Sequence, residues 1–120
     1  MKLAKRGYAT ACVEYRLTGE ATFPAAIYDV KAATRWVRAH AARYHLDPAR
    51  IGITGASAGG NIAALAVVTR GDKRFEGTAN HLGHSSDLQC LVSMDGVIDH
   101  GVRGAWINDS KDALLHRETY

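Results

Sequence analysis

Hydrophobic and polar positions along the chain change their spacing several times, and each change predicts a different element. Residues 8–15, YATACVEY, form a strand candidate after Gly7, and Gly7 is suited to end a short helix over Lys2–Arg6. From Pro24 onward, apolar residues recur every three or four positions as far as residues 46–48, LDP. This spacing predicts a long amphipathic helix that begins at Pro24.

The second half of the chain repeats the alternation of strand and helix. Strands are predicted over Arg50–Thr54 and over Leu88–Met94, the latter ending at Asp95. Between them lie an alanine-rich helix over Asn61–Thr69, predicted to be buried, and a polar surface loop over Arg70–Asp87. This order predicts an α/β fold with a mostly parallel sheet, helices on both faces, and a site at the carboxyl ends of the strands.

Composition and charge narrow the class of protein. The 120 residues carry 15 Lys and Arg against 12 Asp and Glu, a net charge of +3 without a basic run, so a nucleic-acid surface is not expected. No apolar run is long enough to span a membrane. The charged residues of the long helix are expected to form a solvated face: Asp29, Lys31, Arg35, Arg38 and Arg43.

The cysteines and histidines do not indicate a metal or cofactor site. Cys12 and Cys90 lie in strand candidates and are expected to be buried free thiols without a disulfide. The six histidines lack metal-ligand spacing, and His81 and His84, three positions apart, fall in a loop candidate. We therefore expect no metal and no organic cofactor.

Residues 55–60, GASAGG, surround one serine with small side chains. Residues 55–59 match the G-x-S-x-G motif between a predicted strand and a predicted helix, which is the context of a nucleophile elbow. Ser57 is the candidate nucleophile, because small neighbours allow the strained turn and the close approach of the helix to the strand. A glycine-rich turn of purely structural kind gives the same letters, so the motif alone leaves that alternative open.

Longer stretches carry a family resemblance. VEYRL at 13–17, FPAAIYDVKAATRWVRAHAARYHLDPARIGITGASAGGNIAAL at 23–65 and SSDLQCLVSMDGVID at 85–99 resemble the central part of an α/β-hydrolase esterase. The chain is most similar to the acetyl-xylan and feruloyl esterase-like group, near the hormone-sensitive-lipase-like carboxylesterases. The resemblance implies a serine carboxylic-ester hydrolase acting on short acyl, acetyl or feruloyl esters of carbohydrates.

The resemblance also implies roles for individual residues. Ser57 is the nucleophile, Gly55 and Gly59 make space at the elbow, and the Ala58 N–H is one oxyanion donor. Asp95, at a strand end, is a candidate triad acid, although its surroundings resemble a structural turn of the family. His100 is a candidate base and His116 an alternative one, both more typical of surface histidines.

The same resemblance leads us to expect a partial domain over residues 1–120. The oxyanion-loop region of such enzymes precedes the strand that corresponds to residues 8–15, and their acid and histidine follow later strands. The strand of the oxyanion loop would lie between the first two strands predicted here, so its absence leaves both with an unpaired edge. We expect the chain alone to be nearly inactive and Met1 not to be the true start. Localisation and oligomeric state stay open, since relatives of this kind are often exported.

Three alternatives to the esterase remain at this point. A serine peptidase of the prolyl-oligopeptidase-like kind shares the elbow but cleaves amides. A non-catalytic member would bind acyl ligands without turnover. A flavodoxin-like domain would use residues 55–60 as an anion cradle, and its phosphate binding would survive Ser57→Ala.

Overall fold

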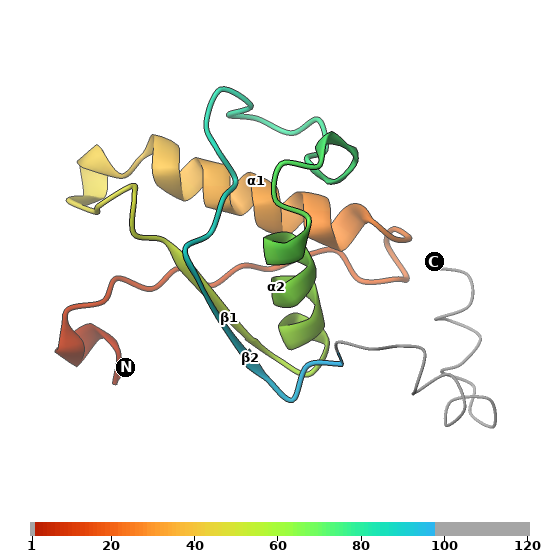
Figure 1. The fold of residues 1–120 in the computed structure, drawn as a ribbon, viewed down its shortest axis with the longest axis horizontal. Coiled ribbons are helices and arrows are strands. Elements are labelled where there is room, and N and C mark those ends of the chain that lie inside the picture. Colours follow the sequence, from red (N-terminus) through yellow and green to blue (C-terminus); the bar gives the residue numbers. More distant parts are fainter. Residues whose placement is uncertain (1, 98–120) are drawn as a thin grey trace.

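The structure is a computed structural model, and it describes residues 2–97. Two α-helices, three short 3₁₀ helices and two strands follow one another in the described residues (Figure 1). They are η1 (Ala4–Arg6), α1 (Ala25–Ala39), η2 (Ala42–Tyr44), β1 (Gly52–Ala56), α2 (Ala58–Val68), η3 (Lys73–Phe75) and β2 (Cys90–Met94). The predicted long helix, both later strands and the helix after the GASAGG motif are thus confirmed, with boundaries shifted by a few residues.

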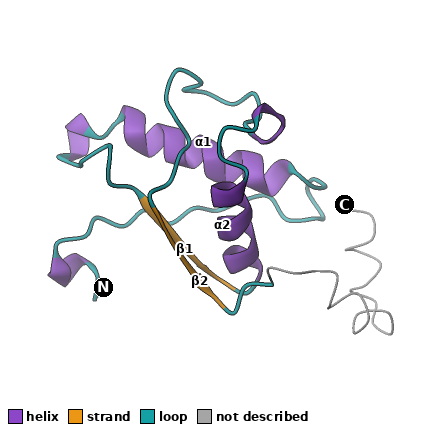
Figure 2. Ribbon diagram, viewed as in Figure 1, coloured by secondary structure: helices purple, strands orange, loops and turns teal. Residues whose placement is uncertain are grey.

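The two strands pair in parallel, as the alternation of elements predicted. Their register runs from Gly52 opposite Cys90 to Ala56 opposite Met94, so both strands end at the same edge (Figure 2). The polypeptide continues from this edge into Ser57 on one strand and Asp95 on the other. Two candidate site residues therefore follow neighbouring strand ends.

The hydrophobic core lies on one face of this sheet. Val30 of α1, Ala66 of α2 and Leu88 form its centre, and Ile53 of β1 packs against them. Along each strand, exposed residues alternate with half-buried ones. In the described part of the chain the helices therefore cover one face, whereas cover on both faces was predicted.

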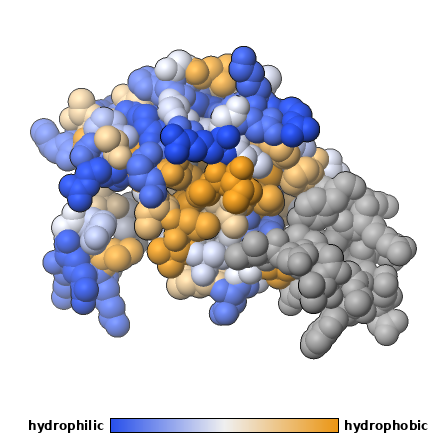
Figure 3. Space-filling model, in the orientation of Figure 1, coloured by the Kyte–Doolittle hydropathy of each residue, from blue (hydrophilic) through white to orange (hydrophobic). Residues whose placement is uncertain are grey.

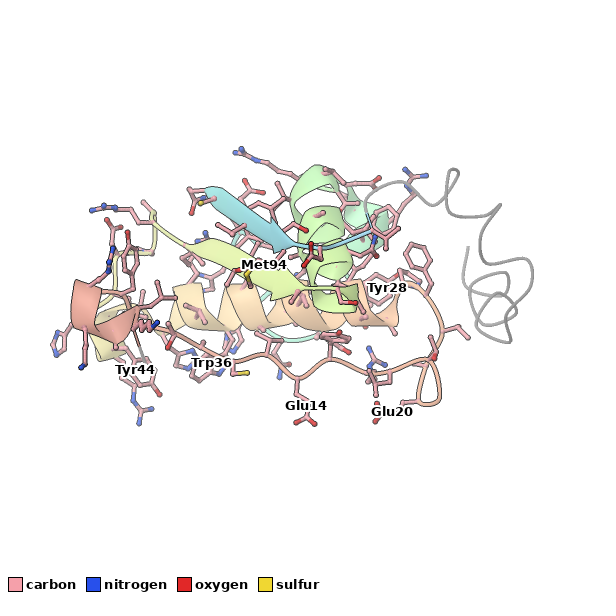
Figure 4. The ribbon with its side chains drawn as sticks, turned by 90° about the horizontal axis from the view of Figure 1, so that it is seen from below. Glu14, Glu20, Tyr28, Trp36, Tyr44 and Met94 are labelled. Atoms are coloured by element: carbon pink, nitrogen blue, oxygen red, sulfur yellow. The ribbon has the colours of Figure 1, made fainter. Side chains whose placement is uncertain are left out.

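Residues 8–15 do not form the predicted strand, since neither strand of the described sheet pairs with them. A strand needs a neighbouring edge to satisfy its backbone N–H and C=O groups. The segment instead runs alongside α1 in the opposite direction (Figures 1 and 4). Arg16 anchors its end there through a bidentate pair with Asp29, with Nη2 at 2.8 Å from Oδ1. The hydrogen bonds from Arg16 hold the pKa of Asp29 below its ordinary value.

The expectation of a solvated charged face on α1 is wrong for two of its residues. Lys31 and Arg35 are 0% and 1% exposed. Lys31 Nζ lies 2.9 Å from one carboxylate oxygen of Glu76, and Arg35 Nη1 lies 2.8 Å from the other. Ser86 Oγ donates to the same carboxylate at 2.8 Å. The predicted surface loop folds back over α1, burying Lys31, Arg35 and Ser86 and leaving Glu76 half-buried. We call these four residues the Glu76 cluster.

Two burial predictions also fail, one for the cysteines and one for the end of α2. Cys12 and Cys90 are free but exposed, not buried. In α2, Ala63, Ala64 and Ala66 are buried as expected, yet Val68 is 74% exposed. The apolar sequence of α2 therefore exceeds what the described residues can cover.

Candidate active site

Ser57 connects β1 to α2 in a backbone conformation that a serine rarely adopts. Its φ of 51° and ψ of −121° place it on the left-handed side of the conformational map. Such a conformation costs a non-glycine residue about 1–3 kcal/mol and persists only where its surroundings enforce it. Ser57 occupies the position before the first turn of α2, but its hydroxyl does not cap that helix. A serine there usually caps, so the exposed hydroxyl of Ser57 is available for other chemistry.

The glycines around Ser57 differ in whether a side chain would fit at their positions. A Cβ on Gly55 would lie 2.2 Å from the Gly59 carbonyl oxygen, and one on Gly60 would lie 2.9 Å from the Gly96 Cα. These distances exclude a side chain at either position. A Cβ on Gly59 would meet only the Tyr15 hydroxyl, at 4.0 Å. The steric requirement for glycine therefore falls on Gly55 and Gly60, whereas a side chain would fit at Gly59.

The Ala58 N–H, the expected oxyanion donor, lies at the N-terminal end of α2. Ala58 is the first residue of α2, and the first N–H groups of a helix have no acceptor within it. The same helix end carries a partial positive charge. Next to the Ser57 hydroxyl, this N–H can donate to a carbonyl oxygen that becomes negative during attack.

Asp95 follows β2 as Ser57 follows β1, so the structure brings both to one edge of the sheet. Asp95 is exposed and, like Ser57, is a non-glycine residue in the left-handed region, with φ 52°. Nothing in its contacts distinguishes a triad acid from a turn residue. His100 and His116, the candidate bases, lie outside the described residues.

Three residues that the motif did not single out connect the first turn of α2 with β2 and the turn after it. Ser93 Oγ donates to the Gly60 carbonyl at 3.3 Å. Asn61 Nδ2 donates to the Val97 carbonyl. Gly96 packs directly against Gly60, and a Cβ there would lie 2.6 Å from the Gly60 carbonyl carbon. These contacts join positions more than 30 residues apart, so no local sequence signal reveals them.

Three of the four histidines within residues 2–97 have neighbouring rings: His40, His81 and His84. His81 stands edge-on to His40 at 5.3 Å between ring centroids and lies 6.4 Å from His84. His40 in turn stacks on Trp36, at 4.3 Å. Within residues 2–97, no group of three or more His, Cys, Asp or Glu side chains is arranged to hold a metal ion. No helix in the same range is long and apolar enough to cross a membrane.

Comparison with known protein families shows to which family this chain belongs. The BD-FAE family profile matches residues 1–115. The chain belongs to the BD-FAE family. This membership confirms the resemblance to esterases that the motifs indicated.

Named relatives of the BD-FAE chain are ester hydrolases. "Probable carboxylic ester hydrolase LipM" of Mycobacterium tuberculosis (strain ATCC 25618 / H37Rv) is 45% identical over 97 residues, which are 81% of this chain and 22% of that protein. "Carboxylesterase NlhH" of the same strain is 53% identical over 53 residues, 44% of this chain and 17% of that protein.

Two solved structures resemble the fold. "Bifunctional GH43-CE" of Bacteroides eggerthii superposes with a TM-score of 0.78 and 42% identity over 82% of this chain and 14% of that one. "Truncated form of carbohydrate esterase from gut microbiota" gives a TM-score of 0.69 and 43% identity over 72% of this chain and 34% of that one. The chain thus spans between about a seventh and a third of the chains in these two structures.

Proposed function

We propose that this chain carries the nucleophile of a serine carboxylic-ester hydrolase, with Ser57 as that nucleophile. The observation that carries the proposal is the conformation of Ser57, strained between β1 and α2 with its hydroxyl exposed and not used as a cap. Strain of this kind concentrates at functional sites. Membership of the BD-FAE family and the names of the relatives support an ester as the substrate.

The chemistry follows a two-step acyl transfer. Ser57 Oγ attacks the ester carbonyl carbon and loses its proton to a base, while the carbonyl oxygen takes up negative charge beside the Ala58 N–H. The C–O bond to the alcohol then breaks, the alcohol leaves with a proton, and water hydrolyses the acyl-enzyme. His100 or His116, or a histidine of another segment of the whole protein, would supply the base, and Asp95 is a candidate for its acidic partner. No metal or cofactor takes part.

Carbohydrate esters are the proposed substrate class of the whole protein. The two similar structures carry the names of a bifunctional GH43-CE protein and a carbohydrate esterase. Short acyl groups such as acetyl, or aromatic acyl groups such as feruloyl, would leave as the acid. In this proposal residues 1–120 form the central part of a single α/β-hydrolase domain.

The proposal is tested by covalent labelling of the longest natural protein that contains this chain with a fluorophosphonate, which phosphonylates activated serines. Intact-mass analysis should show one adduct, and Ser57→Ala should abolish it. Ser85→Ala is the matched control, because Ser85 is exposed in a loop far along the chain from the elbow. A label retained in Ser57→Ala would assign the nucleophile elsewhere.

Substrate class is tested with the longest natural protein that contains this chain. Hydrolysis of acetylated xylo-oligosaccharides or methyl ferulate, compared with a peptide amide, separates a carbohydrate esterase from a serine peptidase. Cleavage of the amide alone would overturn the esterase proposal.

A further inference from the structure

The conformation of Ser57 raises the question of what holds it there. A backbone in the left-handed region relaxes unless its neighbours determine it from several sides. Ser57 itself supplies no restraint through its hydroxyl, because that group does not cap α2. The restraint must therefore come from contacts to its backbone and to the first turn of α2.

One contact from β2 and one from α2 bind the two polar groups of the Ser57 backbone. The Ser57 N–H donates to the Met94 carbonyl at 2.9 Å. The Asn61 N–H donates to the Ser57 carbonyl at 3.1 Å, so both polar groups of the Ser57 backbone are bonded. Asp95, the residue after Met94, is left-handed as well, which means that two strained residues follow the paired strand ends.

Asn61 joins these two strained turns. Its backbone N–H binds Ser57, and its side-chain Nδ2 binds the carbonyl of Val97, two residues beyond Asp95. The neighbouring Gly60 and Gly96 pack without room for a side chain on either, so the turn after β2 lies directly against the first turn of α2. Asn61 therefore bonds to residues on both sides of this contact.

We propose that Asn61 is a positioning residue that holds Ser57 in its left-handed conformation by tying the first turn of α2 to the turn over residues 95–97. This inference rests on the proposed function only for its catalytic consequence. The claim about the Ser57 backbone does not depend on which reaction Ser57 performs. Asn61 touches no reacting atom, and it acts through the position of Ser57.

The test replaces the side-chain amide group of Asn61 with a carboxylate. Asn61→Asp keeps the size of the side chain, but at neutral pH its carboxylate cannot donate to Val97 and repels that carbonyl oxygen. Amide hydrogen exchange of Ser57 in the 120-residue chain should then become about tenfold faster. Amides in the middle of α1, which report on the fold, should keep their protection.

The pH dependence of this variant gives a second, more specific readout. Below about pH 4 the introduced carboxyl becomes protonated and can donate to Val97 again. The difference in Ser57 exchange between Asn61→Asp and the unmodified chain should therefore shrink at low pH. Asn80→Asp is the matched control, because Asn80 is exposed in a loop and the charge change is the same.

The outcomes separate this inference from the proposed function. Unchanged Ser57 exchange in Asn61→Asp would overturn the inference, and so would loss of α1 protection in both Asn61→Asp and the milder Asn61→Ala, since Asn61 would then support the whole fold. If the unmodified chain is labelled by the fluorophosphonate, Asn61→Asp should label about tenfold more slowly. Faster Ser57 exchange in Asn61→Asp, together with no fluorophosphonate label on the longest natural protein that contains this chain, would support the inference and count against the esterase.

Discussion

At the scale of single residues, the elbow depends on where glycine is sterically required and where it is only permitted. Gly60 faces the Gly96 Cα, the Ser93 Oγ and the Gly55 carbonyl oxygen within 3.1 Å of a would-be Cβ. Gly59, its neighbour in the same turn, faces open space apart from the Tyr15 hydroxyl. Two adjacent glycines of one motif therefore have different physical reasons to be glycine.

Alanine substitution should separate the two glycines. Gly60→Ala forces the turn after β2 away from α2 and should lower the free energy of unfolding by about 1–3 kcal/mol, the usual effect of overpacking. Gly59→Ala should raise it by about 0.5 kcal/mol, because alanine restricts the unfolded chain and favours helix. Urea unfolding followed by circular dichroism measures both. Equal losses in the two variants would contradict the steric distinction.

At the scale of elements, the Glu76 cluster fixes the loop between α2 and β2 onto α1. Two buried cations, Lys31 and Arg35, share the one carboxylate of Glu76. Lys31 also donates to the Thr69 carbonyl at 2.8 Å, and Arg35 to the Glu76 carbonyl at 3.0 Å. Thr69 follows the end of α2, so the cluster joins the two helices as well as the loop. The loop fixed in this way leads directly into β2.

Removal of the Glu76 charge should destabilise this arrangement strongly. Glu76→Gln leaves two buried cations without a counter-charge and should lower the free energy of unfolding by about 3 kcal/mol at pH 7. Glu14→Gln is the matched control, because Glu14 is exposed and points away from the body of the molecule (Figure 4). A loss in Glu76→Gln no larger than in the control would show that the cluster contributes little.

The contribution of Glu76 to the free energy of unfolding should depend on pH. Partial burial acts to raise the pKa of Glu76, but hydrogen bonds from Lys31 and Ser86 and the charges of Lys31 and Arg35 lower it below its ordinary value of 4.5. A lowered folded pKa gives stability that is complete above the unfolded value and is lost as the pH falls through the folded value. The difference between the unmodified chain and Glu76→Gln should therefore be full at pH 7 and should shrink below pH 4.5.

Helix α1, which carries Lys31 and Arg35, shows where prediction from sequence fails. The helical spacing of apolar residues correctly predicted α1, since that signal is local. It placed Lys31 and Arg35 in solvent because their partner, Glu76, lies 45 and 41 residues away. Burial of a charged side chain depends on which distant segment folds over it, and one sequence does not reveal that pairing.

At the scale of the whole molecule, local signals predicted the order of elements and the elbow, and non-local pairing escaped them. Pro24 marked the start of α1 and the GASAGG motif marked the turn at Ser57, each within a few residues. Residues 8–15 have a strand-like sequence, but no strand of the described sheet pairs with them. The contact of Gly60 with Gly96 likewise depends on two distant turns meeting. The sequence therefore predicted the α/β class and the candidate nucleophile, Ser57. The contacts that surround the Ser57 turn came only from the structure.

The exposed face of the sheet governs how the 120-residue chain should behave in solution. Val92 and Met94 of β2 are 51% and 50% exposed on the face that no helix of the described residues covers. Hydrophobic side chains also gather in the middle of the surface seen in Figure 3, in the region of the strands and α2. Apolar surface beside an unpaired strand edge favours association between copies.

We therefore expect the apparent mass of the chain to rise with concentration in size-exclusion chromatography with light scattering. Val92→Lys should suppress this rise, because a charge on the open face of β2 opposes stacking of one sheet on another. Val68→Lys is the matched control, since Val68 is still more exposed, at 74%, but lies on α2. If both variants suppress association equally, the added net charge is responsible and not the site of the substitution. If only Val92→Lys suppresses it, the open face of the sheet is the surface through which the copies associate. An unmodified chain that stays monomeric at all concentrations would show that the open face does not drive association.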